Sequence, residues 1–302
     1  MAVYNLLRDG AVHIVFGGNQ YNVKVTPDVS FSQTFAEDAY SVKTLHDQTK
    51  MFQGTSITKA NPANLSFAVH LTKEKDESIV LDLLTDYESN SGGEQLKSFD
   101  LYFVTAESTF KVEGCILTDG EFSLSKDRPL TLTVNGNGKK LTRVGNASFS
   151  IPGNLQSASA TRTPVKALLD VEVGGSDVTN LVTATLSVQN NINWTPYETL
   201  QNSLPVTDAS NAMYPATYTI NDRVVSGNIT QFLTSDNSST FQTFNTNTSV
   251  AVKTINEGST FFNANLSGCM FTKRSETSEV FTQTFDYRLV TSPADLGSII
   301  TY

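Results

Sequence analysis

The sequence predicts a mainly β fold built from two tandem units, and three observations support this prediction. Charged residues make up only 17% of the 302 residues while Ser, Thr and Asn are abundant, which disfavours coiled coils, helical bundles and disordered acidic tails. Apolar and polar residues alternate with period two in many segments, as expected of half-buried strands. A chain of this length has room for two hydrophobic cores.

The strand pattern begins near the N-terminus. Residues 21–25 and 29–35 place Tyr, Val and Phe at alternate positions with polar residues between them. Residues 130–134 alternate again and are followed by Asn135-Gly136-Asn137-Gly138, a sequence typical of a turn with positive φ. We therefore expect a β-hairpin over residues 130–144.

The second half repeats this type of pattern. Val171 and Val173 precede Gly174-Gly175, residues 182–188 alternate, and residues 280–289 form a long late strand. Gly174-Gly175, like Gly17-Gly18, lies beside a strand and lacks the Lys and Ser/Thr of a phosphate-binding loop. Both glycine pairs are therefore expected to form turns or bulges.

One segment has helical spacing instead. Between Asp76 and Tyr87 the apolar residues recur every three or four positions, Asp76 is a suitable N-cap, and Asn90 with Gly92-Gly93 supplies a stop. The sequence predicts one amphipathic helix there, packed on a sheet. A weaker pattern over residues 236–244 predicts a second helix in the equivalent place.

Two landmarks recur about half a chain apart. Cys115 and Cys269 each follow a Gly and precede two apolar residues and Thr, and residues 69–76 correspond to residues 231–236. The order of landmarks is the same, so a duplication is expected. A segment rich in Gly, Asn, Pro, Ser and Ala separates the repeats, and we place the units at residues 1–150 and 151–302.

Two long connections, residues 36–64 and 193–221, separate strand segments by more than the usual few residues. Both carry many apolar side chains, which must either fold back on their own unit or cover a neighbouring subunit. Aromatic residues and Met are enriched in interface cores, so the expected subunit contacts are these residues: Phe35, Tyr40, Leu45, Met51, Phe52, Trp194, Tyr197, Leu200, Met213 and Tyr214.

Charge and topology signals exclude several classes of function. The net charge of −9 disfavours a phosphate-binding surface, because neutralising phosphates needs clustered Lys and Arg. No stretch reaches the roughly 18 apolar residues that span a bilayer. The first ten residues lack the basic start and apolar stretch of a signal peptide, so we expect neither membrane insertion nor export.

Catalytic and metal-binding patterns are not visible in the sequence. The histidines His13, His46 and His70 have no ligand partners at metal-binding spacing, so no metal, cofactor or enzymatic activity is expected. Cys115 and Cys269 could form one disulfide, but two buried free thiols are the expected state.

Several of these elements together resemble one protein family. The Tyr21–Val25 segment, the strand at Val29–Phe35, the Asp76–Tyr87 helix and the closing strands at Leu130–Val134 and Val280–Leu289 are similar in arrangement to the major tail tube proteins of long-tailed bacteriophages. The resemblance covers about residues 15–300 and rests on architecture. It implies two tail-tube-like β-sandwich or barrel units in one chain, each with one helix on its sheet.

The resemblance also implies a function and partners. Copies of the chain would form rings, most simply trimeric and pseudo-six-fold, that stack into a hollow tail tube in the virion. DNA would pass through the lumen without specific binding, and the tape measure, tail terminator and distal tail proteins would be neighbours. Negative walls suit such a conduit, because they do not retain phosphates.

Two alternatives remain open from the sequence. A β-sandwich module could bind a carbohydrate or receptor, with Trp194 and Tyr197 as a stacking platform. Another tail ring protein, of the distal tail or baseplate, would share the same fold. For each apolar residue of the long connections, packing within its own unit is the alternative to a subunit contact.

Overall fold

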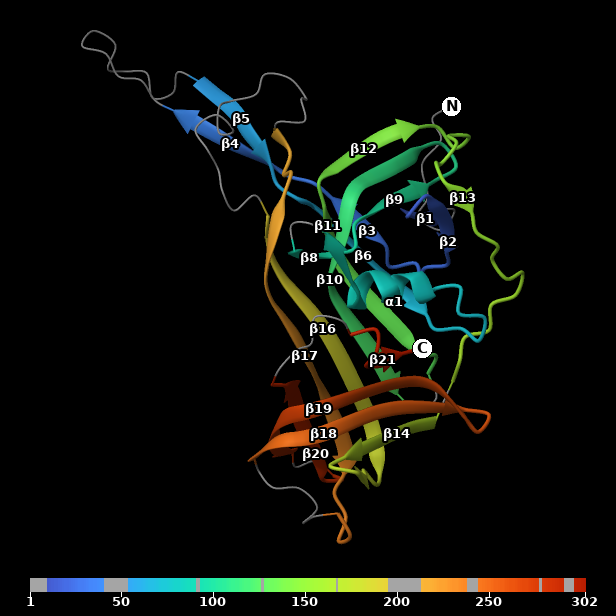
Figure 1. Ribbon diagram of the computed structural model, residues 1–302, viewed down its shortest axis with the longest axis vertical. Coiled ribbons are helices and arrows are strands. Elements are labelled where there is room, and N and C mark those ends of the chain that lie inside the picture. Colours follow the sequence, from blue (N-terminus) through green and yellow to red (C-terminus); the bar gives the residue numbers. More distant parts are fainter. Residues whose placement is uncertain are drawn as a thin grey trace, which may run out of the picture.

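The computed structural model shows an elongated molecule whose two halves share one sheet (Figure 1). Among the described residues almost all regular structure is strand, together with a single α-helix, α1 (Ser78–Thr85), which confirms the mainly β prediction. The structure describes residues 10–40, 54–90, 93–125, 128–166, 168–194, 213–237, 244–276, 279–290 and 296–302.

Two sheets make up the first half, and the long strand β10 (Thr109–Ser125) belongs to both. Its N-terminal part pairs with strands of one sheet and its C-terminal part with strands of the other. The first sheet contains β2 (Asn19–Val23), β1 (Ala11–Phe16), β9 (Phe99–Val104) and β12 (Lys140–Gly145), in the order β2-β1-β9-β10-β12. The second contains β3 (Ser30–Ser32), β6 (Ala63–His70) and β11 (Thr131–Gly138), in the order β3-β6-β11-β10.

A bulge at Gly114 allows β10 to pass between the two sheets. Gly114 has φ of 57°, a conformation that glycine adopts without steric cost, and its N–H donates to the Asp100 carboxylate at 2.9 Å. The pairing of β10 with β9 shifts register between Val112 and Cys115 at this point. Such an extra residue bends a strand, so one strand can serve both layers.

The second half pairs its strands in the same order. The strand β19 (Ser259–Glu276) takes the place of β10: it pairs with β18 over residues 259–272 and with β20 over residues 269–276. One series is β15 (Ser176–Asp177), β14 (Leu168–Val173), β18 (Phe244–Asn256) and β19; the other is β16 (Leu181–Trp194), β17 (Tyr218–Phe232), β20 (Thr282–Leu289) and β19.

The halves are joined edge to edge, because β10 pairs antiparallel with β16 from Asp119 opposite Gln189 to Ser125 opposite Thr183. This joint creates a continuous sheet with the order β3-β6-β11-β10-β16-β17-β20-β19, which we call the eight-strand sheet. The strand pairings of this sheet do not return to their start. In the described part of the chain the sheet is therefore open, with β3 at one end and the last residues of β19 at the other.

The core lies between this sheet and the elements that cover one of its faces. Helix α1 packs directly on β10, where a Cβ on Gly120 would lie 2.1 Å from Leu84 Cδ2, so only glycine allows this approach. Phe122 of β10 contacts Phe262 of β19, with ring centroids 4.9 Å apart. The two halves thus share apolar packing as well as a strand joint.

The predicted hairpin at residues 130–144 is wrong. Residues 135–138 lie inside β11, and β11 and β12 continue one another along β10 in place of pairing together. The two glycines serve close packing: a Cβ on Gly136 would lie 2.5 Å from the Ile116 carbonyl oxygen, and one on Gly138 would lie 2.5 Å from Val112 Cγ1. Glycine here accommodates neighbours and does not mark a turn.

The predicted helix is present but shorter. It begins after Glu77, which makes no side-chain capping bond, whereas Asp76 binds Arg162 and the N–H of Ser159. The chain is extended again by Asp86 and enters a hairpin, well before the predicted stop. This hairpin consists of β7 (Tyr87–Asn90) and β8 (Gly93–Leu96).

The predictions for the glycine pairs, the second helix and the thiols have different outcomes. Gly17-Gly18 and Gly174-Gly175 both have positive φ and form turns between paired strands, as predicted. The predicted helix at residues 236–244 lies mostly outside the described residues. Cys115 and Cys269 are free thiols and buried.

The segment after β12 packs on the first half. The short strand β13 (Asn154–Leu155) pairs in parallel with β2, and Val165 exchanges backbone bonds with Leu71 and Leu130. The boundary between residues 150 and 151 stays a prediction. The chain described ends at β21 (Ile300–Thr301), which pairs with β19 near α1.

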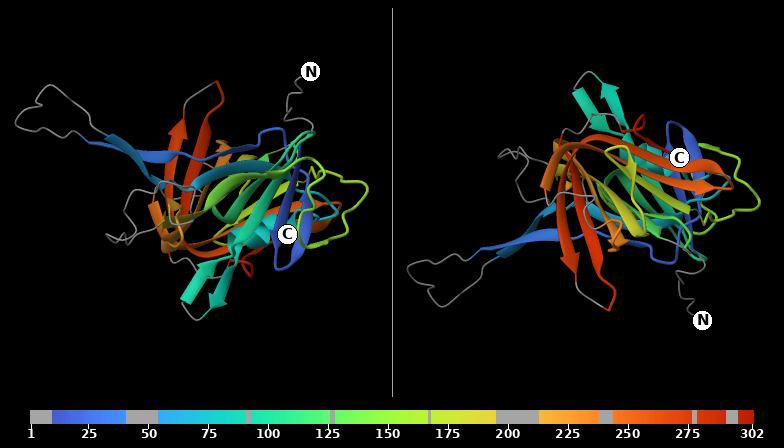
Figure 2. Two further views of the ribbon diagram at one scale, coloured as in Figure 1. Left: turned by 90° about the horizontal axis from the view of Figure 1, so that it is seen from above. Right: turned by 90° about the horizontal axis from the view of Figure 1, so that it is seen from below.

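The described parts of both long connections include strand. The first forms a hairpin of β4 (Phe35–Tyr40) and β5 (Gly54–Ala60) that projects from the body, which we call the first arm (Figures 1 and 2). The described residues of the second connection, 193–194 and 213–221, lie at the distal end of the paired strands β16 and β17, with Met213 and Tyr214 leading into β17; we call this end the second arm.

Candidate functional site: an open polar face with two arms

One face of the eight-strand sheet is a broad polar surface. Side chains alternate across each strand, so the residues on either side of a core residue such as Phe122 or Val134 point away from the core. We call the surface formed by these outward residues the open polar face. Its members include Ser30, Ser32, Asn64, Ser66, His70, Thr131, Thr133, Asn135, Asp119, Glu121, Ser123, Thr183, Thr185, Ser187, Gln189, Ser226, Asn228, Thr230, Asp286, Arg288, Thr272 and Arg274.

Rows of mainly uncharged polar residues cross this face and continue across the joint. Ser123 lies opposite Thr131 in the first half and opposite Thr185 in the second, and Thr185 in turn faces Asn228. Asn228 is paired with Asp286 on the next strand. The row therefore presents hydroxyl and amide groups across both halves.

Charges on the open polar face are few and of both signs. It carries the acids Asp119 and Glu121 on β10 and Asp286 on β20, together with the arginines Arg274 and Arg288, and Arg274 Nε is 3.4 Å from the Asp286 carboxylate. Strong phosphate binding requires several uncompensated Lys or Arg side chains on one surface. Within the described part of this face, the arrangement does not provide such a cluster.

The joint between the halves is reinforced by a buried arginine. Arg223 of β17 is 8% exposed, and its Nη1 donates to the Thr85 carbonyl oxygen at the end of α1 at 2.8 Å. Its Nε donates to Asn190 Oδ1 at 2.7 Å, and its guanidinium lies 4.1 Å from the centre of the Tyr87 ring. A cation at the C-terminus of a helix offsets the helix dipole and the unpaired carbonyls.

Asn190 completes this contact from the neighbouring strand. Its Nδ2 donates to the Leu117 carbonyl oxygen at 3.1 Å and lies 3.4 Å from that of Leu84. The helix of the first half is therefore capped by the hairpin of the second half. The two halves are held as one piece by strand pairing, apolar packing and this cap.

The structure brings together one pair of the predicted contact residues. The Phe35 ring, at the base of the first arm, is 47% exposed and meets the Tyr214 ring of the second arm edge to face, with centroids 6.5 Å apart. Lys140 Nζ lies 4.6 Å from the Tyr214 ring centre. The two arms thus meet beside β12.

The remaining predicted contact residues are scattered or not described. Met213 is buried, and Trp194 packs against Tyr218 of its own hairpin with ring centroids 5.2 Å apart. Both side chains therefore pack within the chain, and their part in subunit contacts stays a prediction. Residues Leu45, Met51, Phe52, Tyr197 and Leu200, and the side chain of Tyr40, lie outside the described part of the structure.

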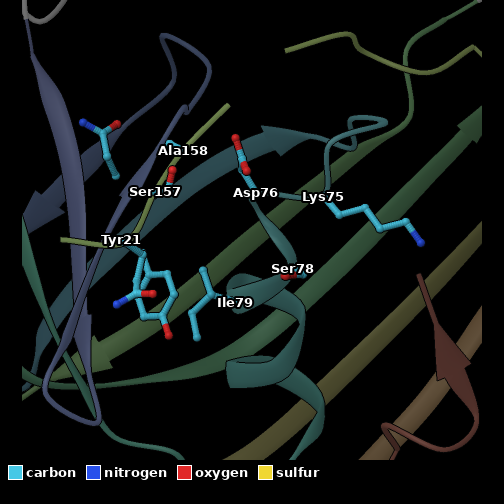
Figure 3. Close-up of a pocket in the computed structure, with 9 residues that line it drawn as sticks. Tyr21, Lys75, Asp76, Ser78, Ile79, Ser157 and Ala158 are labelled. Atoms are coloured by element: carbon cyan, nitrogen blue, oxygen red, sulfur yellow. The ribbon is translucent and has the colours of Figure 1, made fainter. Parts of the chain in front are cut away.

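A shallow cavity lies at the start of α1 (Figure 3), where Tyr21, Lys75, Ser78 and Ile79 line it together with the segment after β13. Its carboxylate, Asp76, forms an ion pair with Arg162, whose Nε is 3.1 Å away, and accepts a hydrogen bond from the N–H of Ser159 at 2.8 Å. The polar groups of this cavity hold the segment on the first half.

Cys115, Cys269 and His13, which were considered above as possible reactive or metal-binding groups, are packed or hydrogen-bonded within the fold. Burial raises the pKa of Cys115 strongly and that of Cys269 to about 11. Burial lowers the pKa of His13, with a smaller contribution from Lys24, and His13 Nδ1 bonds the Gln20 amide at 3.0 Å. In the described residues no group of three or more His, Cys, Asp or Glu is placed to hold a metal ion.

The helix in the described residues, α1, is not long and apolar enough to cross a membrane.

Sequence reasoning missed Arg223 and Asn190, because neither lies in a recognisable motif. The repeat anchored at Cys115 and Cys269 was the available signal for the joint, since it predicts equivalent strands in both halves.

A family model of bacteriophage baseplate tube proteins matches residues 2–301. The chain belongs to the bacteriophage baseplate tube protein family. It is thus a structural protein associated with the phage tail, as the resemblance to tail tube proteins implied at this coarser level. The family is the baseplate tube rather than the major tail tube, which favours the alternative of a baseplate protein.

Other comparisons add little to the family assignment. No curated protein matches the chain. A solved structure of the baseplate of the anti-feeding prophage, symmetrised six-fold, contains a chain that is 9% identical, with a TM-score of 0.35. That match covers 49% of this baseplate tube protein and 100% of the other chain.

Proposed function

We propose that this baseplate tube protein is a ring-forming structural subunit whose eight-strand sheets surround a channel for DNA. The observation that carries the proposal is the repeated four-strand set, β3-β6-β11-β10 and β16-β17-β20-β19, joined edge to edge within one chain. The equal pairing orders support a tandem duplication. Three chains with two units each form a pseudo-six-fold ring in this proposal.

The open polar face supports the channel role. A conduit for DNA should present groups that remain hydrated and do not hold phosphates, because each ion pair with a phosphate slows passage. Rows of Ser, Thr, Asn and Gln, with acids beside two arginines, meet this requirement. The chain acts by assembly and passage, without bond chemistry.

The arms are the proposed contacts between rings or with adjoining tail proteins. Phe35 and Tyr214 present aromatic surface where the two arms meet, and aromatic residues are enriched in interface cores. The tape measure, distal tail and terminator proteins, together with further copies of the chain, are the candidate neighbours. The virion is the proposed location.

Negative-stain electron microscopy with mass measurement in solution tests the proposal. Purified chain at increasing concentration is expected to give rings of three copies with a central hole, and stacks of such rings. A monomer at every concentration would contradict it and favour the carbohydrate-binding alternative, which glycan screening would then examine.

A matched pair of variants tests the arms. Phe35→Glu places a charge in the aromatic contact and should abolish stacking while leaving rings intact. Leu168→Glu is the control, because Leu168 is 72% exposed on β14, at the far end of the molecule from the arms (Figure 1). Equal stacking by both variants would show that Phe35 does not take part in the contact between rings.

A further inference from the structure

We propose that the loop before α1, residues 72–77, is a two-sided coupling device that holds residues 154–163 in place only while Tyr302 is docked on its other side. We call residues 72–77 the coupling loop and residues 154–163 the strap. The strap lies on the first half, whereas Tyr302 follows β21 beside the second half. The device belongs to the fold of a single chain and does not depend on the ring proposed above.

The strap is held on the first half by polar contacts. None of its ten residues is buried, and the side chain of Leu155 is 66% exposed. Its strand β13 pairs with β2 over two residues only. A segment with so few buried apolar contacts opens more easily than the core, so the strap is suited to being held or released as a unit.

Two carboxylates of the coupling loop fasten the strap. Asp76 accepts a hydrogen bond from the N–H of Ser159 at 2.8 Å and forms an ion pair with Arg162, whose Nε is 3.1 Å away. Glu74 accepts from the N–H of Thr163 at 2.9 Å and from its hydroxyl at 3.1 Å. The strap therefore stays in place only while the coupling loop directs these two carboxylates toward it.

The other side of the coupling loop is tied to Tyr302. The Tyr302 hydroxyl accepts from the Thr72 N–H at 2.8 Å and donates to the carboxylate of Glu77, which is 3% exposed. The same carboxylate accepts from Thr72 Oγ1 at 2.8 Å. Burial raises the pKa of Tyr302 strongly and the bond to Glu77 adds to the shift, so the hydroxyl keeps its proton at neutral pH. One side chain thus holds both ends of the loop.

Lys75 connects the two sides through its backbone. Its φ is 60°, a left-handed conformation that is unfavourable for a residue with a Cβ, so surrounding contacts must hold it. Its Nζ lies 5.2 Å from the centre of the Tyr302 ring and 6.0 Å from that of Phe261. These two rings meet edge to face, with centroids 5.1 Å apart. Docked Tyr302 therefore stabilises the left-handed form of Lys75.

The conformation of Lys75 determines where Asp76, the next residue, is directed. Figure 3 shows the Lys75 side chain extending away from Ser157 and Ala158 of the strap. Without Tyr302, the contacts that offset the unfavourable φ are lost and Lys75 returns to negative φ. The Asp76 carboxylate then leaves the strap. The backbone of Lys75 is thus a two-state element that both the strap and Tyr302 bias.

Lys73 has a similar two-sided arrangement. Its N–H donates to the Thr163 carbonyl oxygen at 3.2 Å, and its Nζ lies 2.5 Å from the carboxylate of Glu257, in the turn between β18 and β19. The Lys73 and Glu257 side chains are 40% and 76% exposed, and exposed ion pairs contribute little. Tyr302 is therefore the contact that carries the coupling.

Hydrogen exchange of the full chain, followed by mass spectrometry, tests the coupling. The N–H groups of Ser159 and Thr163 report on the strap directly, because they donate to Asp76 and Glu74. Tyr302→Ala should speed exchange of the strap about tenfold, a typical coupling between two sites. Thr301→Ala, at an exposed neighbouring position, is the matched control and should leave the strap unchanged.

Lys75→Gly tests whether the backbone transmits the effect. Glycine adopts a φ of 60° without steric cost, so the coupling loop should keep its form without Tyr302. Adding Tyr302→Ala to a Lys75→Gly chain should therefore leave exchange of the strap nearly unchanged. Coupling is also reciprocal, so Asp76→Ala, which unfastens the strap, should speed exchange of residues 296–302 by a similar factor.

Three outcomes would overturn the proposal. Unchanged strap exchange in the Tyr302→Ala chain would show that the two sides are independent. Equal acceleration in residues 183–189, at the β10–β16 joint, would show general loosening in place of a local device. An equal effect of Tyr302→Ala with and without Lys75→Gly would exclude the Lys75 backbone as the carrier. Should Tyr302→Ala fail to fold, Tyr302→Phe removes the hydroxyl alone and is judged by the same three outcomes.

Discussion

At one equivalent position in the core, the two halves place a large and a small residue on opposite strands. In the first half Leu65 of β6 lies opposite Gly136 of β11; at the equivalent place in the second half Gly227 of β17 lies opposite Tyr287 of β20. Large and small residues have exchanged strands while the pairing order has stayed the same. Backbone pairing, rather than the identity of core side chains, is therefore what the halves share.

A second position differs in polarity. The first half places Val69 opposite Leu132, whereas the second half places Gln231 opposite Gln283. Both glutamines are buried, with Gln231 Nε2 3.3 Å from Gln283 Oε1, and Gln231 Oε1 has no hydrogen-bond partner in the described structure. The second half thus carries a polar pair where the first has an apolar one.

A substitution at Gly227 should produce the largest change in stability. Gly227→Ala places a Cβ 2.0 Å from the Thr185 carbonyl oxygen and 2.4 Å from Tyr287 Oη, and should lower the free energy of unfolding by about 3 kcal/mol or more. Urea denaturation measures the change. Ser226→Ala is the control, with a cost of about 0.5 kcal/mol or less, and equal costs would mean that the close approach is absent.

Arg223 tests how strongly the halves depend on each other. Arg223→Met removes the cap of α1 and should cost about 3 kcal/mol in thermal or urea unfolding, because it deletes charge-assisted hydrogen bonds to the Thr85 carbonyl oxygen and to Asn190 Oδ1 in a buried setting. Arg288→Met, on the open polar face, should change stability by about 0.5 kcal/mol or less. Similar losses of stability in the two variants would show that the Arg223 cap does not stabilise the joint.

The glutamine pair can be converted to the first-half arrangement. The double variant Gln231→Val with Gln283→Leu should be neutral or stabilise the chain by about 1 kcal/mol, because both polar partners are removed together. Gln231→Val alone should destabilise it by about 1–2 kcal/mol, since Gln283 loses its partner. A double variant less stable than the single one would show that the second half requires the polar pair.

The smallest expected difference between the halves is in the reactivity of their buried thiols. At pH 8 both should react slowly with iodoacetamide, Cys115 more slowly than Cys269, because burial raises both pKa values and only the thiolate reacts. A raised pKa stabilises the fold below the unfolded value of 9.0, and this contribution is lost as the pH rises toward about 11 for Cys269. Cys269→Ala should flatten the fall in stability in that range; an unchanged profile would contradict this.

The sequence predicted strands well where alternation was strong, as in β16 and β20. It failed at Asn135-Gly136-Asn137-Gly138, because the same glycines that permit a turn also permit close packing inside a strand. Local patterns give the elements and leave their partners undetermined. The β10–β16 joint brings together residues some 60 or 70 positions apart in sequence, and no periodicity encodes that pairing.

The candidate site was predictable in part for the same reason. Apolar content identified the arms, and the structure brings Phe35 and Tyr214 together. The open polar face consists of ordinary Ser, Thr and Asn residues, which stand out only when their strands lie side by side. Arg223 gains its role from a helix more than a hundred residues earlier, so its own surroundings in sequence carry no signal.

The β10–β16 joint also bears on how fast an assembly could form. Two strands tethered in one polypeptide meet at an effective concentration in the millimolar range, whatever the number of chains in the solution. In the ring that we propose, the joint within each chain would therefore be complete as soon as that chain folds. Only the joints between chains would depend on dilution, which makes nucleation less sensitive to subunit supply than in a tube of separate single units.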